Sequence, residues 1–133
     1  MSITSIQTAL DTQLAAVSGL PVIQLENTRY EPKTGVAWSR PTLLPAETER
    51  LSSAKDLLQG LYQVDLFYPA DKGAATASAM ADLVKAAFPR GSTLTSGSTT
   101  VHITKSWREP AQSLNQFYQV ILLVRWESEQ SKG

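Results

Sequence analysis

The chain has 133 residues, with 12 Lys and Arg against 12 Asp and Glu and no cysteine. A balanced charge argues against a protein that works on the nucleic-acid backbone or on an anionic membrane, because both tasks need surplus cations. The lack of cysteine excludes disulfides, cysteine-zinc sites, iron–sulfur clusters and cysteine nucleophiles.

A chain of this length predicts one domain over residues 1–133. The first residues lack the basic stretch and apolar core of a signal peptide, so we expect no secretory leader. The longest apolar run, Val120–Val124, is far shorter than the roughly 18 residues of a membrane span. We therefore expect no membrane partner.

The N-terminal segment has the pattern of an amphipathic helix. Apolar residues recur at three- and four-residue steps from Ile3 to Val17, and a glycine and a proline follow soon after. Val22–Leu25 then predicts a short strand. Residues 27–35 carry Asn, Pro, Lys and Gly, and predict a loop.

After this loop the pattern changes from a strand to an irregular stretch. Val36–Arg40 alternates as a strand does. Pro41 and Pro45 lack the N–H that a central strand donates, so a strand here lies at a sheet edge or stops early. Residues 41–59 include the most charged part of the chain, and they predict a long arm with a helical turn near 52–58.

The clearest alternation begins at Gly60, where Gly60–Tyr68 predicts a strand. One of its faces consists of Tyr62, Val64, Leu66 and Tyr68, and the other of Leu61, Gln63, Asp65 and Phe67. The alanine-rich segment Ala74–Phe88 predicts a helix, because alanine is the best helix former. The expected apolar stripe of this helix consists of Met80, Leu83, Val84, Ala87 and Phe88.

The last third of the chain predicts mainly strands. Ser92–Thr95 is a short strand and Thr100–Lys105 a longer one, whereas Trp107–Leu114 is expected as a loop. Phe117–Trp126 has the strongest strand pattern, and its five consecutive aliphatic residues predict a central strand that is covered on both sides over part of its length. Residues 128–133 form a polar tail that we expect to be frayed.

This order of elements predicts an α+β fold. We expect a single mainly antiparallel (mixed) β-sheet, two helices packed on one of its faces, and the long arm.

The sequence contains few residues that suggest chemistry. His102 is the one histidine, and it lies at an outward position of a predicted strand. A half-exposed strand histidine is the simpler interpretation, and a small hydrolase or ligand-binding domain that uses His102 is the alternative. No phosphate-binding glycine loop and no spaced metal ligands are present. We therefore expect no catalytic residue, no cofactor and no metal site, with a loosely bound Mg²⁺ at an acidic subunit interface as an open alternative.

A contact surface between subunits is the remaining type of site. Trp38 and Arg40 stand at the start of the predicted arm, and Trp and Arg are the residues most enriched at interface hot spots. Ordinary packing is the alternative for Trp38. The residues that we predict for contact with other subunits or partners lie in this arm: Trp38, Arg40, Glu47, Glu49, Arg50 and Lys55.

Several runs of the chain resemble a family of short phage proteins. The most distinctive are Gly60–Ala70, which reads GLYQVDLFYPA, and Phe88–Gly91, which reads FPRG. The others are Trp38–Arg40 followed by Pro45, Val101–Ile103, and Tyr118–Trp126. Together they resemble the tail terminator, or tail completion, proteins of long-tailed phages, of the lambda minor tail protein U type. The likeness extends over roughly residues 20–127.

The resemblance implies a structural role without catalysis. Such proteins form a hexameric ring on the head-proximal end of the tail tube, where they end tube growth and offer a surface for joining the head. The implied partners are further copies of the chain, the tail tube protein, the tape-measure protein and a head-completion or connector protein. No specific nucleic-acid binding is implied, although DNA passes through such a ring. The implied location is the virion tail, after assembly in the host cytoplasm. Another neck component or a tail-tube protein is the alternative within virions.

Among the residues that match the family pattern, Asp65 is the chemically unusual one. It stands between apolar strand residues, and an unpaired buried carboxylate is costly. We therefore expect it to find a backbone partner or an Arg or Lys side chain.

Overall fold

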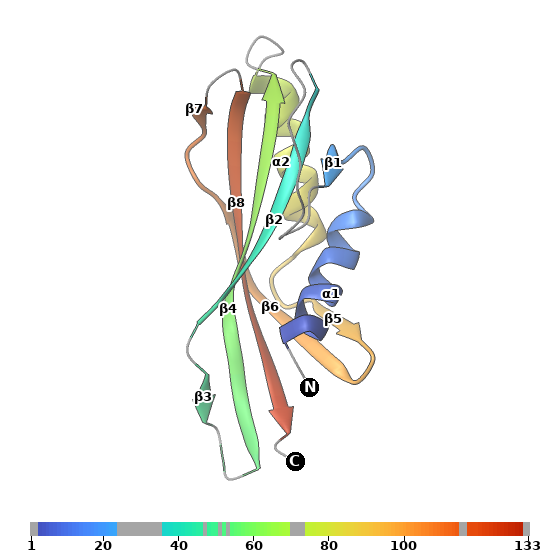
Figure 1. Cartoon of the computed structure of the whole chain (residues 1–133), viewed down its shortest axis with the longest axis vertical. Helices are drawn as coiled ribbons and strands as arrows, with labels where there is room; N and C mark the ends of the chain where they lie inside the picture. The colour runs from blue at the N-terminus through green and yellow to red at the C-terminus, as the bar shows by residue number, and fades with distance from the viewer. Residues whose placement is uncertain are drawn as a thin grey trace.

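The fold combines two helices with one long, strongly curled sheet (Figure 1). The computed structural model describes residues 3–23, 36–46, 48–50, 52, 54–69, 74–114 and 117–131. The helices are α1 (Ile3–Ala15) and α2 (Ala74–Ala87). The strands are β1 (Val22–Ile23), β2 (Trp38–Pro45), β3 (Glu49–Arg50), β4 (Lys55–Pro69), β5 (Thr93–Ser96), β6 (Thr99–Arg108), β7 (Gln112–Leu114) and β8 (Phe117–Ser131).

All eight strands of the described residues belong to one sheet. The main order is β1-β2-β4-β8-β6-β5, with β3 paired to β4 and β7 paired to β8. β1 and β2 are parallel, whereas every other pair is antiparallel. The central pair, β4 and β8, stays in register from Lys55 opposite Ser131 to Pro69 opposite Phe117. The sheet and its two helices confirm the predicted α+β class.

Both helices cover the same face of the sheet, and the main core lies between them (Figure 1). One face of β4 is buried there, from Tyr62 to Tyr68, together with its counterpart on β8 from Val120 to Trp126. α1 contributes Ile6, Leu10 and Leu14 through its three- and four-residue spacing. The alternation along the two strands therefore separates the core residues from those on the other face.

Polar bonds hold α1 in place above the sheet. The buried Tyr62 donates its hydroxyl to a carboxylate oxygen of Asp11 in α1. Gln13 donates its side-chain amide to the Ala87 carbonyl at 2.7 Å, which joins α1 to the end of α2.

Tyr68 lies in the core at the end of β4. Desolvation by burial raises the pKa of its phenol above 10.0, so this hydroxyl stays neutral at ordinary pH.

The predicted arm is largely β-structure, which corrects the expectation of an irregular stretch over 41–59. β2 continues to Pro45, β3 pairs with Leu57 and Asp56, and β4 begins at Lys55. The helical turn expected near 52–58 is therefore wrong. Within 41–59, Leu43 is buried in the main core and Leu58 packs against it. The other residues of this stretch give no clean apolar alternation from which a strand is recognised in a sequence.

The expectation that the prolines mark an edge is confirmed. β1 pairs only with Trp38 and Ser39, so the outer side of β2 beyond Ser39 has no partner strand among the described residues. Ala46 donates its N–H to the Gln59 carbonyl of β4. Because main-chain groups alternate in direction, Pro41 and Pro45 stand at positions that point away from β4. Neither proline therefore interrupts the ladder, and both remove donors from the open edge.

Two regions of strand and one helix residue also differ from the expectation. β6 extends to Arg108, and β7 occupies part of the expected loop over Trp107–Leu114. β8 continues to Ser131, so most of the expected frayed tail over 128–133 is paired with β4. Leu83 lies outside the core and is 51% exposed, because α2 buries the face of Ala77, Met80, Ala81 and Val84 instead. The predicted loop over 27–35 lies outside the described residues.

Candidate subunit-contact surface

No helix of the described residues covers the second face of the sheet, and one end of this face carries a small aromatic cluster. Trp38 of β2 lies directly opposite Phe67 of β4, and Phe117 of β8 lies beside them. The Trp38 and Phe67 rings stack with centroids 4.1 Å apart, and Phe117 meets both rings edge-on at 6.4 Å. The Trp38 residue is only 8% exposed in the single chain. Trp38 therefore packs against Phe67 and Phe117 within the single chain, before any subunit contact forms.

An ion pair between a buried carboxylate and a half-exposed guanidinium lies next to this cluster. An Arg40 guanidinium nitrogen is 3.2 Å from a carboxylate oxygen of Asp65, whose side chain is 1% exposed against 46% for Arg40. The same carboxylate accepts hydrogen bonds from the amides of Gln63 at 3.0 Å and Gln119 at 3.3 Å. The guanidinium also lies 5.3 Å from the centre of the Phe67 ring. The expectation that Asp65 finds an Arg partner is confirmed.

Replacing Arg40 with Ala should destabilise the fold through Asp65. The carboxylate would keep two amide donors but lose its compensating charge. We therefore expect a loss of about 1–2 kcal/mol, below the 3–5 kcal/mol typical of a fully buried pair. Chemical denaturation of the R40A, D65N and R40A/D65N variants measures this as a double-mutant cycle. If R40A costs as much in the D65N background as in the wild type, the ion pair is not the cause.

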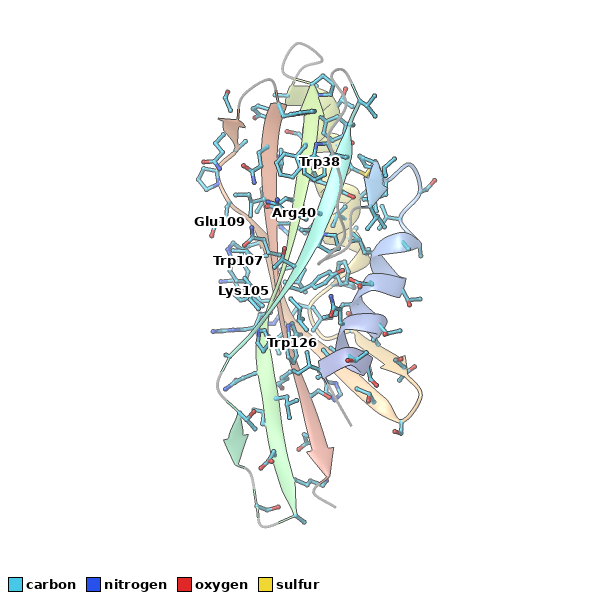
Figure 2. All side chains as sticks on the ribbon, in the orientation of Figure 1. Trp38, Arg40, Lys105, Trp107, Glu109 and Trp126 are labelled. Carbon is cyan, nitrogen blue, oxygen red and sulfur yellow. The ribbon has the colours of Figure 1, made fainter. Side chains whose placement is uncertain are left out.

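The middle of the uncovered face is apolar and bears two cations. Leu61, Ile121 and Leu123 are half-buried there, and Leu44 is 41% exposed. Trp107 lies opposite Leu123. Figure 2 shows Lys105, Trp107 and Glu109 along the side of the sheet away from α1.

Trp107 is held by charged neighbours on both sides. The Lys105 ammonium lies 5.0 Å from the centre of the Trp107 ring, and Trp107 Nε1 lies 3.4 Å from a Glu109 carboxylate oxygen. The second cation is the exposed Arg125, directly opposite Lys105. Sequence reasoning missed Lys105 and Trp107 because it ended the strand at residue 105. A β-bulge between Ile103 and Lys105 moves Lys105 and Trp107 to the face opposite Ile103, where simple alternation would not place them.

His102 lies in a shallow hollow at the other end of this face. The hollow of about 640 Å³ is lined by Leu57, Arg90, Gly91, His102, Ile103, Thr104, Glu127 and Glu129. The His102 side chain is exposed, as predicted, and the Thr93 hydroxyl is 3.3 Å from its Nδ1. A catalytic triad needs an acid that orients the histidine. Among the described residues, His102 has no hydrogen bond to either glutamate, so this geometry does not support the hydrolase alternative.

The predicted contact residues do not form one site. Trp38 and Arg40 lie together at the aromatic end, whereas Glu49 and Arg50 of β3 and Lys55 of β4 lie at the other end of the ribbon. The twelve residue steps along β4 from Lys55 to Phe67, the partner of Trp38, correspond to about 40 Å. Glu47 lies outside the described residues. The role of these residues in subunit contact stays a prediction.

Comparison with known proteins identifies the family. The family model described as phage tail terminator protein matches residues 5–126, which is nearly the whole chain. The chain belongs to the phage tail terminator family. It is therefore a structural component of the virion tail, and its family membership implies a non-enzymatic role.

Two solved structures have the same fold as this chain. One chain with 23% identity is matched over 99% of its length, covers 100% of the tail terminator chain and gives a TM-score of 0.75. A chain from the virion of a native gene transfer agent particle has 19% identity, coverage of 96% on both sides and a TM-score of 0.66. Among curated proteins, none matches this chain.

Two further features concern ions and membranes. Within the described ranges, no group of three or more His, Asp or Glu residues is placed to hold a metal ion. No described helix of the tail terminator is long and apolar enough to cross a membrane.

Proposed function

We propose that this tail terminator forms a ring on the head-proximal end of the tail tube. The ring ends tube polymerisation and offers its outer side to the head-completion or connector protein. The observation that carries this proposal is the family match over residues 5–126. By the resemblance noted in the sequence, the ring has six copies, and its inner neighbours are the tail tube and tape-measure proteins.

The physical requirements of this role are simple. Each copy must bind the next through a heterologous contact that closes, because such a contact makes a ring rather than a filament. The ring must also leave no surface on which another tube ring can add. The prolines on the outer edge of β2 support this second requirement, since Pro41 and Pro45 remove N–H donors from an edge that could otherwise pair with a further strand.

Electron microscopy of particles produced without this chain tests the proposal. We expect headless particles whose tails are irregular and too long, because nothing stops tube growth. Supplying the wild-type chain in trans should restore a uniform tail length and joining to heads. Full heads beside unattached tails of normal length would assign the chain to joining alone, and normal infectious particles would contradict both roles.

A further inference from the structure

The outer side of β6 is open over the second half of the strand. β5 pairs with β6 only as far as His102. The main chain of Ile103 then bonds to Gly91 and Ser92, at 2.7 and 2.9 Å. From Thr104 to Arg108, no strand of the described residues pairs with this side of β6. Figure 2 shows Lys105 within this stretch, along the margin of the sheet.

Two residues of the open stretch direct their main-chain groups outward. Glu109 donates its N–H to the Ile121 carbonyl of β8, and the direction of main-chain groups alternates along a strand. The main chains of Ser106 and Arg108 therefore point away from β8. Neither residue is a proline, so this edge keeps the donors that the edge of β2 lacks. The open stretch is about 17 Å long, which is enough for an added strand.

A cationic hollow adjoins this edge, between β6 and the end of α2. It has a volume of about 370 Å³, and its charged lining residues are Asp82, Lys85, Arg90 and Lys105. All four side chains are exposed. Within the described part of the chain, none of the four forms an ion pair. The hollow therefore offers three cations against one carboxylate.

The charges around the hollow keep this surplus on its helix side. Arg108 adds a further cation there, because its guanidinium donates to the Ser78 hydroxyl of α2 at 3.0 Å. Glu109 accepts a bond from the Trp107 indole on the other face. Glu127 also lies on that other face, opposite His102, and not on the side of α2. An acidic ligand is thus favoured on the α2 side of the edge.

A second copy of the same edge is a poor occupant. Edge-to-edge pairing of two copies would bring the cations of one edge against those of the other, and like charges across a strand pair are destabilising. Lys105 and the β-bulge before it are features that discourage such pairing. The same cations attract a strand of opposite charge.

We propose that the outer edge of β6, from Thr104 to Arg108, binds an extended acidic segment of a partner protein as an added strand. The acidic side chains of the segment face Lys85 and Arg90, and the residues that alternate with them are apolar and face Trp107. Strand addition gains affinity from main-chain bonds and specificity from alternate side chains. This site goes beyond the proposed ring, because it depends neither on the number of copies nor on the tube.

Amide hydrogen exchange of the purified chain tests the pairing. The probe is the pentapeptide EVEVE, acetylated and amidated, which places its acidic residues on one face of a strand. In the free chain, the amides of Ser106 and Arg108 should exchange fast, whereas that of Glu109, which is bonded to β8, should exchange slowly. Saturating peptide should slow the first two by about tenfold or more. Unchanged exchange of both would overturn the inference.

Two other probes and the free chain exclude different occupants. The peptide KVKVK has the wrong charge and should give no protection. A thymidine oligonucleotide has negative charge but no peptide main chain, so it should not protect Ser106 and Arg108 either. Equal protection by the oligonucleotide would overturn the strand addition. Protection that rises with the concentration of the chain alone would assign the edge to a contact between copies, and would also overturn it.

Ser106→Pro tests the edge from the side of the protein. The proline removes an outward N–H and leaves the bonds to β8 in place, so the variant should fold but no longer bind EVEVE. Ser106→Ala keeps the N–H and should bind as the wild type does. Circular dichroism checks that both variants fold. A folded Ser106→Pro variant that binds the peptide normally would contradict main-chain pairing.

Removal of the cations provides a measurement that leaves the main chain unchanged. Lys85→Ala with Arg90→Ala should weaken EVEVE binding by about fivefold or more, from two lost charge contacts. Lys55→Ala with Arg125→Ala removes the same charge from exposed positions outside the hollow, and should weaken binding by less than about twofold. Equal losses would indicate attraction by overall charge and contradict the site. The ring proposal is tested separately, by tail length in particles that lack the chain.

Discussion

Replacing Trp38 with Ala should cost about 3–5 kcal/mol of unfolding free energy, the usual range for removing a buried aromatic side chain. The indole stacks on Phe67 at 4.1 Å, meets Phe117 edge-on and lies 5.9 Å from the Arg40 guanidinium. Its loss would open a cavity and expose the buried Asp65 pair to water. Urea denaturation followed by circular dichroism measures the change, because it does not depend on tryptophan fluorescence.

Two further variants show whether stacking is the cause. Trp38→Phe keeps an aromatic ring beside Phe67 and should recover more than half of the loss. Trp107→Ala removes a half-buried indole from the open part of the same face and should cost clearly less. If Trp38→Ala costs under about 1 kcal/mol yet abolishes assembly, then Trp38 acts mainly in subunit contact and not in packing.

Replacing Gly60 with Ala should also destabilise the protein strongly, by about 3 kcal/mol, the upper part of the range for overpacking. A Cβ at this position would meet the Leu44 carbonyl oxygen at 2.4 Å, the Pro45 Cα at 2.9 Å and the Ala46 nitrogen at 3.0 Å. All three are main-chain atoms, so no side chain can rotate away. β2 would have to move from β4 at the place where Gly60 pairs with both Pro45 and Trp126.

The control for Gly60 is Gly97, where an added Cβ meets nothing within 4 Å but φ is +59°. Gly97→Ala should cost only the backbone strain of about 1–2 kcal/mol. Hydrogen exchange adds a local measurement: in the Gly60→Ala variant, the amides of Leu57–Gln59 should lose protection more than those of α1. Equal losses for the two glycine variants, without this local change, would refute the proposed clash.

Much of the core could be predicted from local patterns. The alternation from Tyr62 to Tyr68 and from Tyr118 to Trp126 separated the two faces correctly, and the spacing in α1 placed its buried stripe. α2 was less clear, because its alanines allow several faces and Leu83 proved to be exposed. A small side chain loses little by facing either way, so a stripe made mainly of alanine indicates a helix better than it indicates the buried side.

The candidate surface was harder to predict because it depends on long-range pairing. Asp65 required a charged partner on energetic grounds, but only the register of β2 against β4 made that partner Arg40, 25 residues away. Glu49, Arg50 and Lys55 were predicted as contact residues of the same arm as Trp38, and the register places them at the opposite end of the ribbon.

Local information in the chain thus decided the helices, the buried faces of the long strands and the family, because side-chain periodicity and short motifs depend on neighbouring residues alone. The extent of β2 and β4 and the aromatic cluster of Trp38, Phe67 and Phe117 were decided by the tertiary structure. A polar strand such as the start of β4 is held by the strands beside it and not by an apolar face of its own. Its partners lie far away in the sequence, and only the folded sheet brings them together.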